Sequence, residues 1–192
     1  MKEIKWAILM SGWGRSAVKT LELYEENKLE GHSIELVVYE KEENGVLEPA
    51  KKAGINTVHL PKASFENESM YYDELISYLR KHEIDYLFLM GYGHIIRDPF
   101  LSLYSDKIVN IHPSILPSFR GKKAIQQAMN YGVKVTGITT HLIDEELDRG
   151  KILCQRCIRI RDGESFDELD QRFVEEGKKI IEDTFNEILK NE

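Results

Sequence analysis

The chain has 192 residues, a length that fits one domain, and we expect a single domain over residues 1–192. Its hydrophobic content of 42% and charged content of 31% are ordinary for a soluble globular protein. The formal charge of −7 argues against duplex nucleic acid or an anionic membrane as the main partner. No apolar stretch reaches the roughly 20 residues of a membrane span, and the N-terminus is too polar for a signal peptide, so we expect a cytoplasmic protein.

Short β-rich runs alternate with helical stretches over the first half of the chain. The pattern predicts strands at 5–10, 34–39, 56–60, 84–90 and 107–111, and helices at 15–29, 46–53 and 69–82. This alternation predicts an α/β fold: a Rossmann-like, doubly wound, mostly parallel sheet with helices on both faces.

The pattern changes after Pro117. Two longer strands are predicted at 133–143 and 151–160, joined by the acidic segment 144–150. A last helix begins at Ser165, which forms a capping-box pair with Glu168.

The two cysteines, Cys154 and Cys157, have the C-x-x-C spacing of redox and zinc motifs. Their flanking sequence reads as a strand, where residues three apart point to opposite faces. A second C-x-x-C is missing as well, so we assign both cysteines a structural role.

The first predicted strand ends in the sequence S-G-W-G-R-S at 11–16. Glycines at a strand-to-helix turn allow the backbone to approach an anion at a helix N-terminus. The third glycine of a dinucleotide fingerprint and the lysine of a Walker loop are both missing. An anion site and a plain tight turn therefore both stay open for this segment.

Asn110 and His112 follow a predicted buried strand, at the edge where open α/β sheets bind ligands. Residues two apart on an extended chain point the same way, and an amide beside an imidazole suits oxyanion stabilisation in acyl transfer. The alternative is a turn asparagine and a surface histidine. The acidic loop after His141, with its carboxylates at 144–148, reads as a metal site, a general base or a solvated turn.

Taken together, these segments resemble a known family. Residues 110–121 read N-I-H-P-S-I-L-P-S-F-R-G, and after about a turn and a half of helix the chain continues G-V-K-V-T-G-I-T-T-H-L-I-D-E-E-L-D-R-G. These stretches resemble the folate-dependent formyltransferases, above all those acting on glycinamide ribonucleotide. The resemblance implies that Asn110, His112 and Asp148 are catalytic. A protonated His112 and the Asn110 amide would stabilise the oxyanion formed when an amine attacks the formyl carbon of 10-formyltetrahydrofolate, the co-substrate. Asp148 would raise the pKa of His112 and accept the amine's proton through water, and no metal is implied.

The resemblance also implies two sets of ligand-binding residues. The folate would contact His94, Ile95, Ile96, Asn110, Ile143, Asp144 and Asp148. The acceptor, a small amine that is phosphorylated in some family members, would contact Gly12, Trp13, Gly14, Arg15, Ser16, Pro113 and Glu176.

Four departures from the family pattern fall on ligand-facing positions. Ser16 stands where the family's turn S-G-x-G-S-N has asparagine, and His94 stands where its M-R-I-L segment has arginine. The stretch 65–72 has no arginine, and Gly177 replaces a helix glutamate, with Glu176 one step away. The acceptor therefore stays open between glycinamide ribonucleotide and another small amine such as an amino sugar. Hydrolysis of formyltetrahydrofolate, and folate binding without turnover, are the alternatives from other classes.

Overall fold

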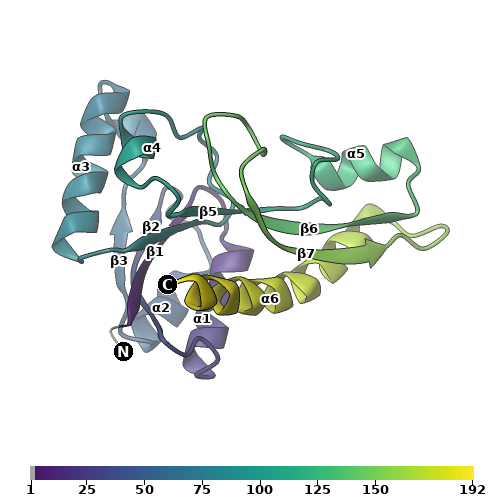
Figure 1. Ribbon diagram of the computed structural model, residues 1–192, viewed down its shortest axis with the longest axis horizontal. Coiled ribbons are helices and arrows are strands. Elements are labelled where there is room, and N and C mark those ends of the chain that lie inside the picture. The colour runs from purple at the N-terminus through teal and green to yellow at the C-terminus, as the bar shows by residue number, and fades with distance from the viewer. Residues whose placement is uncertain (1–2) are drawn as a thin grey trace. The chain divides into compact units, whose positions relative to one another are not determined.

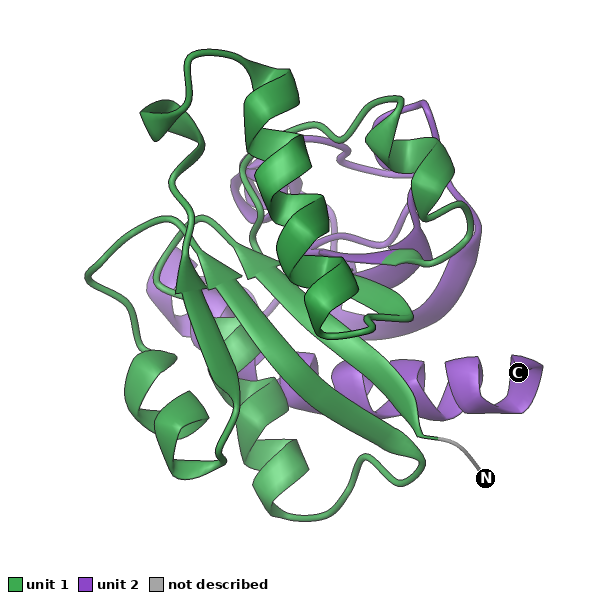
Figure 2. Cartoon of the chain, turned by 90° about the vertical axis from the view of Figure 1, so that its left-hand side faces the viewer, with its two compact units in different colours: residues 1–108 green, residues 109–192 purple. Residues whose placement is uncertain are grey.

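The computed structural model describes residues 3–192, which divide into two compact units at residue 108 (Figure 2). The expectation of one domain over 1–192 stays a prediction beside this division. No helix within 3–192 is long and apolar enough to cross a membrane.

The first unit contains four parallel strands in the order β3-β2-β1-β4. They are β1 (Ile4–Met10), β2 (His32–Tyr39), β3 (Asn56–His59) and β4 (Tyr86–Leu89). The chain winds outward from β1 to β3 and then returns to the other side of β1. Because parallel crossovers are right-handed, this order places the connecting helices on both faces of the strands.

The helices of this unit are α1 (Arg15–Glu25), α2 (Leu47–Lys52), α3 (Glu68–Lys81) and α4 (Phe100–Leu103), with a 3-10 turn η1 (Lys62–Ser64) before α3. Figure 2 shows α3 in front of the strands and α1 behind them. Asn67 begins α3 because its side chain accepts a hydrogen bond from the Met70 N–H. All four residues of β4 are buried, as expected for a parallel strand covered on both faces.

The second unit is antiparallel, in the order β5-β6-β7. Its elements are β5 (Ile108–His112), α5 (Ala124–Tyr131), β6 (Val135–Leu142), β7 (Ile152–Arg159) and α6 (Phe166–Asn191), which are labelled in Figure 1. Leu169, Phe173 and Ile180 of α6 form a buried cluster with Ile138 of β6 and Ile158 of β7. The predicted capping box is present, since Ser165 and Glu168 each bond the other's backbone N–H.

The two cysteines lie on β7 as predicted from the strand pattern. Cys154 is half-buried and packs against the cluster under α6, whereas Cys157 is exposed. Both are free thiols.

Candidate active site

His112 is the last residue of β5 and is buried with only 5% of its surface exposed. Its Nε2 lies 2.9 Å from the carbonyl oxygen of Phe119, and its Nδ1 lies 3.5 Å from Asp148 Oδ2. A doubly protonated imidazolium would satisfy both contacts, because each nitrogen then donates to an oxygen.

The loop after β5 is fixed to the neighbouring strand by hydrogen bonds. The Thr139 hydroxyl donates to the carbonyl of Ser114 and accepts from the Leu116 N–H. Gln155 of β7 donates to the Leu116 carbonyl. Pro113 is half-buried at the start of this loop. Phe119, whose carbonyl faces His112, is therefore held at the end of an anchored segment.

Burial lowers the pKa of His112 below 6.5, and this outweighs the hydrogen bond to Phe119 and the charge of Asp148, which both raise it. The sequence-based expectation was that Asp148 raises the pKa of His112. The charge of Asp148 does act in that direction, but the pKa of His112 as a whole is lowered, so the expected outcome was wrong. The physical reason is the loss of solvation around an imidazole enclosed by the 113–121 loop.

Asp148 is nearly buried, with 8% of its surface exposed, and has a left-handed backbone with φ of 51°. The Gly121 N–H donates to its Oδ2 at 2.7 Å. Burial alone would raise the pKa of Asp148, but the His141 imidazole 3.7 Å away, the hydrogen bond from the Gly121 N–H and the charge of His112 outweigh it and lower the pKa below 3.8. Asp148 is thus a buried carboxylate that stays ionised at neutral pH.

His141 on β6 completes this group, although the sequence analysis placed it beside the acidic loop without a catalytic or ligand-binding role. It pairs with Asn110 in the β5–β6 register, and its Nε2 lies 3.1 Å from Asn110 Nδ2 and 3.7 Å from Asp148 Oδ1. Its Nδ1 lies 2.9 Å from the Leu142 carbonyl. With the Nδ1 proton donated to that carbonyl, Nε2 accepts from the Asn110 amide and fixes its orientation. The available sequence signal was the polar run Thr139, Thr140 and His141 inside a predicted strand, and the structure shows all three to be buried.

The four side chains Asn110, His112, His141 and Asp148 therefore lie together in the second unit. They offer a carboxylate, an imidazole and an amide whose second N–H is not used in the hydrogen bond to His141. This is a set suited to stabilising an oxyanion and moving a proton. Within residues 3–192 no group of three or more His, Cys, Asp or Glu side chains is placed to hold a metal ion.

The predicted acceptor turn lies in the first unit, where β1 ends and α1 begins. Gly14 is the N-cap of α1 with φ of 85°, and a Cβ there would lie 2.7 Å from Met10 Sδ, so both its conformation and its packing favour glycine. Trp13 and Arg15 are exposed, and Gly12 and Ser16 are half-buried.

The predicted folate segment follows β4. His94 Nε2 lies 2.7 Å from Glu40 Oε1 at the end of β2, an ion-pair distance without the geometry of a hydrogen bond. Ile95 is 51% exposed and Ile96 is buried. In the second unit, Ile143 is half-buried and the exposed Asp144 accepts a hydrogen bond from the Glu146 N–H, as a turn residue does.

Glu176 on α6 is engaged in ion pairs. Its carboxylate lies 3.6 Å from Arg156 Nη1 of β7 and 2.6 Å from Lys179 Nζ. A ligand that uses Glu176 must therefore compete with two cations of the same unit.

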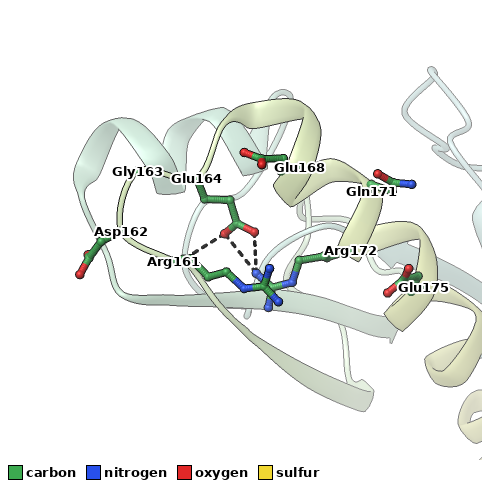
Figure 3. A pocket seen from close by; sticks show the side chains of 8 residues that line it. All are labelled: Arg161, Asp162, Gly163, Glu164, Glu168, Gln171, Arg172 and Glu175. Atoms are coloured by element: carbon green, nitrogen blue, oxygen red, sulfur yellow. Dashed lines mark hydrogen bonds and ion pairs between the residues drawn. The ribbon is translucent and has the colours of Figure 1, made fainter.

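A pocket of about 390 Å³ lies where β7 leads into α6, away from the predicted catalytic residues (Figure 3). Glu164 fills one side of it and accepts from the Arg161 N–H at 2.9 Å and from Arg172 Nη1 at 2.8 Å. These bonds shape the turn before α6. The pocket is lined by Arg161, Asp162, Gly163, Glu164, Glu168, Gln171, Arg172 and Glu175.

Comparison with known proteins identifies the family. The family model described as "Formyl transferase" matches residues 4–185. The chain belongs to this formyl transferase family. The formyl transferase domain thus spans both compact units.

Its relatives agree with this assignment. The chain is 36% identical over 168 residues to a phosphoribosylglycinamide formyltransferase of Bacillus subtilis, covering 88% of this chain and 86% of that protein. It is 32% identical over 171 residues to the human trifunctional purine biosynthetic protein adenosine-3, covering 89% of this chain and 17% of that much longer protein. A solved phosphoribosylglycinamide formyltransferase from Bacillus halodurans superposes with a TM-score of 0.90 at 30% identity, over 96% of this chain and 95% of that one.

These findings confirm the α/β, Rossmann-like fold and the assignment as a folate-dependent formyltransferase. The family uses 10-formyltetrahydrofolate as co-substrate, as the sequence resemblance implied.

Proposed function

We propose that this chain transfers the formyl group of 10-formyltetrahydrofolate to the primary amine of a small molecule, with Asn110, His112 and Asp148 as its catalytic residues. The observation that carries the assignment of these residues is their cluster at the end of β5, where His112 lies 3.5 Å from Asp148 and Asn110 is held by His141. Formyl transfer needs an oxyanion donor and a proton acceptor, and this cluster supplies both.

The reaction proceeds by addition and elimination. The amine nitrogen attacks the formyl carbon, and the carbonyl electrons move to oxygen to form a tetrahedral oxyanion. The bond from the formyl carbon to N10 of the folate then breaks as the carbonyl reforms. N10 takes up one proton while the amine loses one, so the products are the N-formyl amine and tetrahydrofolate.

Each residue has a distinct role in these steps. The Asn110 amide donates to the developing oxyanion, and the His112 Nε2 proton transfers its hydrogen bond from the Phe119 carbonyl to the same oxygen. Asp148 is ionised at neutral pH, so its carboxylate can accept the proton that the amine loses, through a water molecule. His141 is a positioning residue that fixes the Asn110 amide.

The names of the relatives make glycinamide ribonucleotide the first acceptor to test. The proposed ligand residues remain those of the folate set, His94, Ile95, Ile96, Asn110, Ile143, Asp144 and Asp148, and the acceptor set around Gly12–Ser16 with Pro113 and Glu176. A carboxylate beside the acceptor turn, Glu40, favours a second candidate, a small amine without a phosphate. Two free cysteines agree with a cytoplasmic location, which we include in the proposal.

Turnover of 10-formyltetrahydrofolate, followed optically with and without an amine, tests the proposal. We expect loss of the formyl donor only when an amine acceptor is present, with one formyl group appearing on the amine for each tetrahydrofolate formed. Release of formate without an acceptor would instead identify a hydrolase. A protein that binds the folate but turns over neither way would be a folate-binding protein, and the proposal would be wrong.

A further inference from the structure

Glu40, the residue after β2, lies beside the acceptor turn and has no counterpart in the sequence-based site. The Ser11 hydroxyl, at the end of β1, donates to Glu40 Oε1 at 2.8 Å, and Ser11 in turn accepts from the Gly93 N–H at 2.8 Å. His94 Nε2 lies 2.7 Å from the same Oε1. The hydrogen bond from Ser11 therefore holds the Glu40 carboxylate at the carboxyl ends of β1 and β2, and His94, which follows β4, lies at ion-pair distance without hydrogen-bond geometry.

The placement of this carboxylate matters because an α/β turn of this kind normally attracts an anion. The first N–H groups of a helix and the helix dipole favour negative charge at such a turn. The side chain of Glu40 is only 17% exposed, so its charge is weakly screened by solvent. Arg15 at the start of α1 is exposed, where its charge is screened more strongly. A phosphate dianion at this turn would face the like charge of the half-buried Glu40 carboxylate.

The same carboxylate is well placed to accept hydrogen bonds. Within residues 3–192, both side-chain contacts of Glu40 are made through Oε1. An ionised carboxylate has about four acceptor positions on its two oxygens, so Oε2 keeps acceptor capacity for a donor such as a hydroxyl group.

Trp13 supplies a second surface at this turn. Its side chain is 57% exposed, yet it is held against the loop after β2, because the Gly45 N–H donates to the Trp13 carbonyl at 2.9 Å. A Cβ on Gly45 would lie 2.4 Å from Trp13 Cη2, so the indole ring packs directly on the Gly45 backbone. An exposed indole fixed in this way offers a flat apolar face to a ligand.

We propose that the acceptor turn of this formyltransferase binds a neutral, hydroxylated group, with Glu40 accepting a hydroxyl hydrogen bond and Trp13 covering the apolar face of a sugar ring. The acceptor is then a primary amine that carries a sugar or similar polyol without a phosphate at this end. The inference rests on the proposed function and specifies the substrate class of the same site.

The test compares two acceptors that differ only in the phosphate: glycinamide ribonucleotide and its dephosphorylated form, glycinamide ribonucleoside. We expect the wild-type kcat/KM to be higher for the ribonucleoside by roughly tenfold or more, since like charges in a binding site cost at least about that factor. Glu40→Gln should reduce this preference by about tenfold. Glu43→Gln, which changes an exposed glutamate of the same loop, should leave it unchanged. A wild-type preference for the ribonucleotide would overturn the inference.

A binding measurement separates this inference from the formyl-transfer proposal. The chain has two tryptophans, and Trp6 is fully buried, so a ligand at the turn should change the fluorescence of Trp13 alone. We expect titration with the ribonucleoside to change that fluorescence at lower concentration than the ribonucleotide, with no change in Trp13→Phe. This result without any turnover would support the inference and contradict the proposed function. Tighter binding of the ribonucleotide, or no binding of the ribonucleoside, would overturn the inference.

Gly45→Ala tests the role of the indole without altering Glu40. The added methyl group must displace the Trp13 ring, because the site of its Cβ is occupied by ring carbons. We expect Gly45→Ala and Trp13→Ala each to raise KM for the ribonucleoside by about tenfold, because each removes the contact of one aromatic ring with the ligand. We expect little change in kcat. An unchanged KM in both variants would contradict the contact with Trp13.

Discussion

Asp148 combines a rare backbone conformation with a buried charge. A left-handed φ costs a residue with a Cβ about 1 kcal/mol or more, and Asp and Asn tolerate it better than most residues. The conformation brings Oδ2 to the Gly121 N–H and within 3.5 Å of His112. Strained residues of this kind are concentrated at functional sites, where the surrounding structure holds them in place.

Asp148→Asn separates the charge from the backbone geometry. Asparagine tolerates the same φ and can still accept from Gly121, but it cannot accept the amine's proton or favour protonation of His112. We expect kcat/KM for formyl transfer to fall by about 10² to 10⁴, the usual contribution of general acid–base catalysis, with near-wild-type folding. Glu145→Gln, an exposed change in the same loop, is the control and should retain activity. Near-normal activity of Asp148→Asn would remove Asp148 from the mechanism.

His112→Ala should abolish transfer while leaving folate affinity within a few-fold. The imidazole is proposed to contact the oxyanion, which exists only along the reaction path, so its loss affects the transition state more than the bound folate. Single-turnover kinetics and equilibrium folate binding measured on the same preparation check this. A variant that keeps turnover would show that the oxyanion is stabilised elsewhere.

At the scale of elements, the close approach of β6 and β7 depends on a glycine. A Cβ at Gly137 would lie 2.0 Å from the Arg156 carbonyl oxygen of the paired strand. Backbone cannot move aside without breaking the β6–β7 ladder that carries Thr139, His141 and Gln155. The position of the proposed catalytic residues thus depends on this packing.

Gly137→Ala should therefore destabilise the protein by about 3 kcal/mol, at the upper end of the range for overpacking. Gly177→Ala, in the middle of α6, is the matched control because nothing lies within 4 Å of its Cβ position. Alanine is the better helix former there, so we expect this variant to gain roughly 0.5–1 kcal/mol. Urea unfolding of both variants measures the difference, and equal stability would contradict the steric argument.

The sequence pattern predicted the seven strands and four of the helices, with ends that differ from the structure by a few residues. The helix predicted at 15–29 ends at Glu25, and the strand predicted at 84–90 spans Tyr86–Leu89. The first and last residues of a helix or strand depend on local hydrogen bonds, which the periodicity of apolar residues does not show. The short α4 and the 3-10 turn η1 were not predicted, since segments of 4 and 3 residues are too short to show a helical period.

Only the part of the candidate site that lies within one strand could be predicted from the sequence. Asn110 and His112 lie two apart on one strand, so their shared face follows from the sequence. The contacts of His141 with Asn110 and of Phe119 with His112 depend on strand register and loop path, which local patterns do not determine. Glu40 follows β2, whereas the predicted acceptor turn follows β1. Its hydrogen bond with Ser11 joins residues 29 apart in the sequence, a contact that local patterns do not show.

For the whole molecule, the buried residues His112 and Asp148 make the free energy of unfolding depend on pH. The folded state lowers the pKa of His112, so the unfolded chain binds more protons below about pH 6.5. Stability from this group is fully present above that pH and is lost as the pH falls through the folded pKa. The lowered pKa of Asp148 has the same sign, and its contribution is lost as the pH falls below about 3.9.

We therefore expect the free energy of unfolding to fall in two stages on acidification, the first beginning near pH 6.5. His112→Gln should flatten the first stage, because it removes the group that titrates there. Urea unfolding of wild type and variant at pH 7.5, 5.5 and 4 measures the difference between them. Parallel curves for the two proteins would show that His112 is not protonated more readily in the unfolded chain.

The strand that carries both cysteines also gives the molecule one readily modified position. Cys157 is exposed on β7, whereas burial raises the pKa of the half-buried Cys154 thiol and so disfavours its reactive thiolate form. A maleimide dye should therefore attach at Cys157 first and leave Cys154 unmodified on short exposure. The chain then carries a single reporter on β7, near Ser118 and Phe119, without any engineered cysteine, and mass spectrometry of the labelled protein shows whether one dye or two have bound.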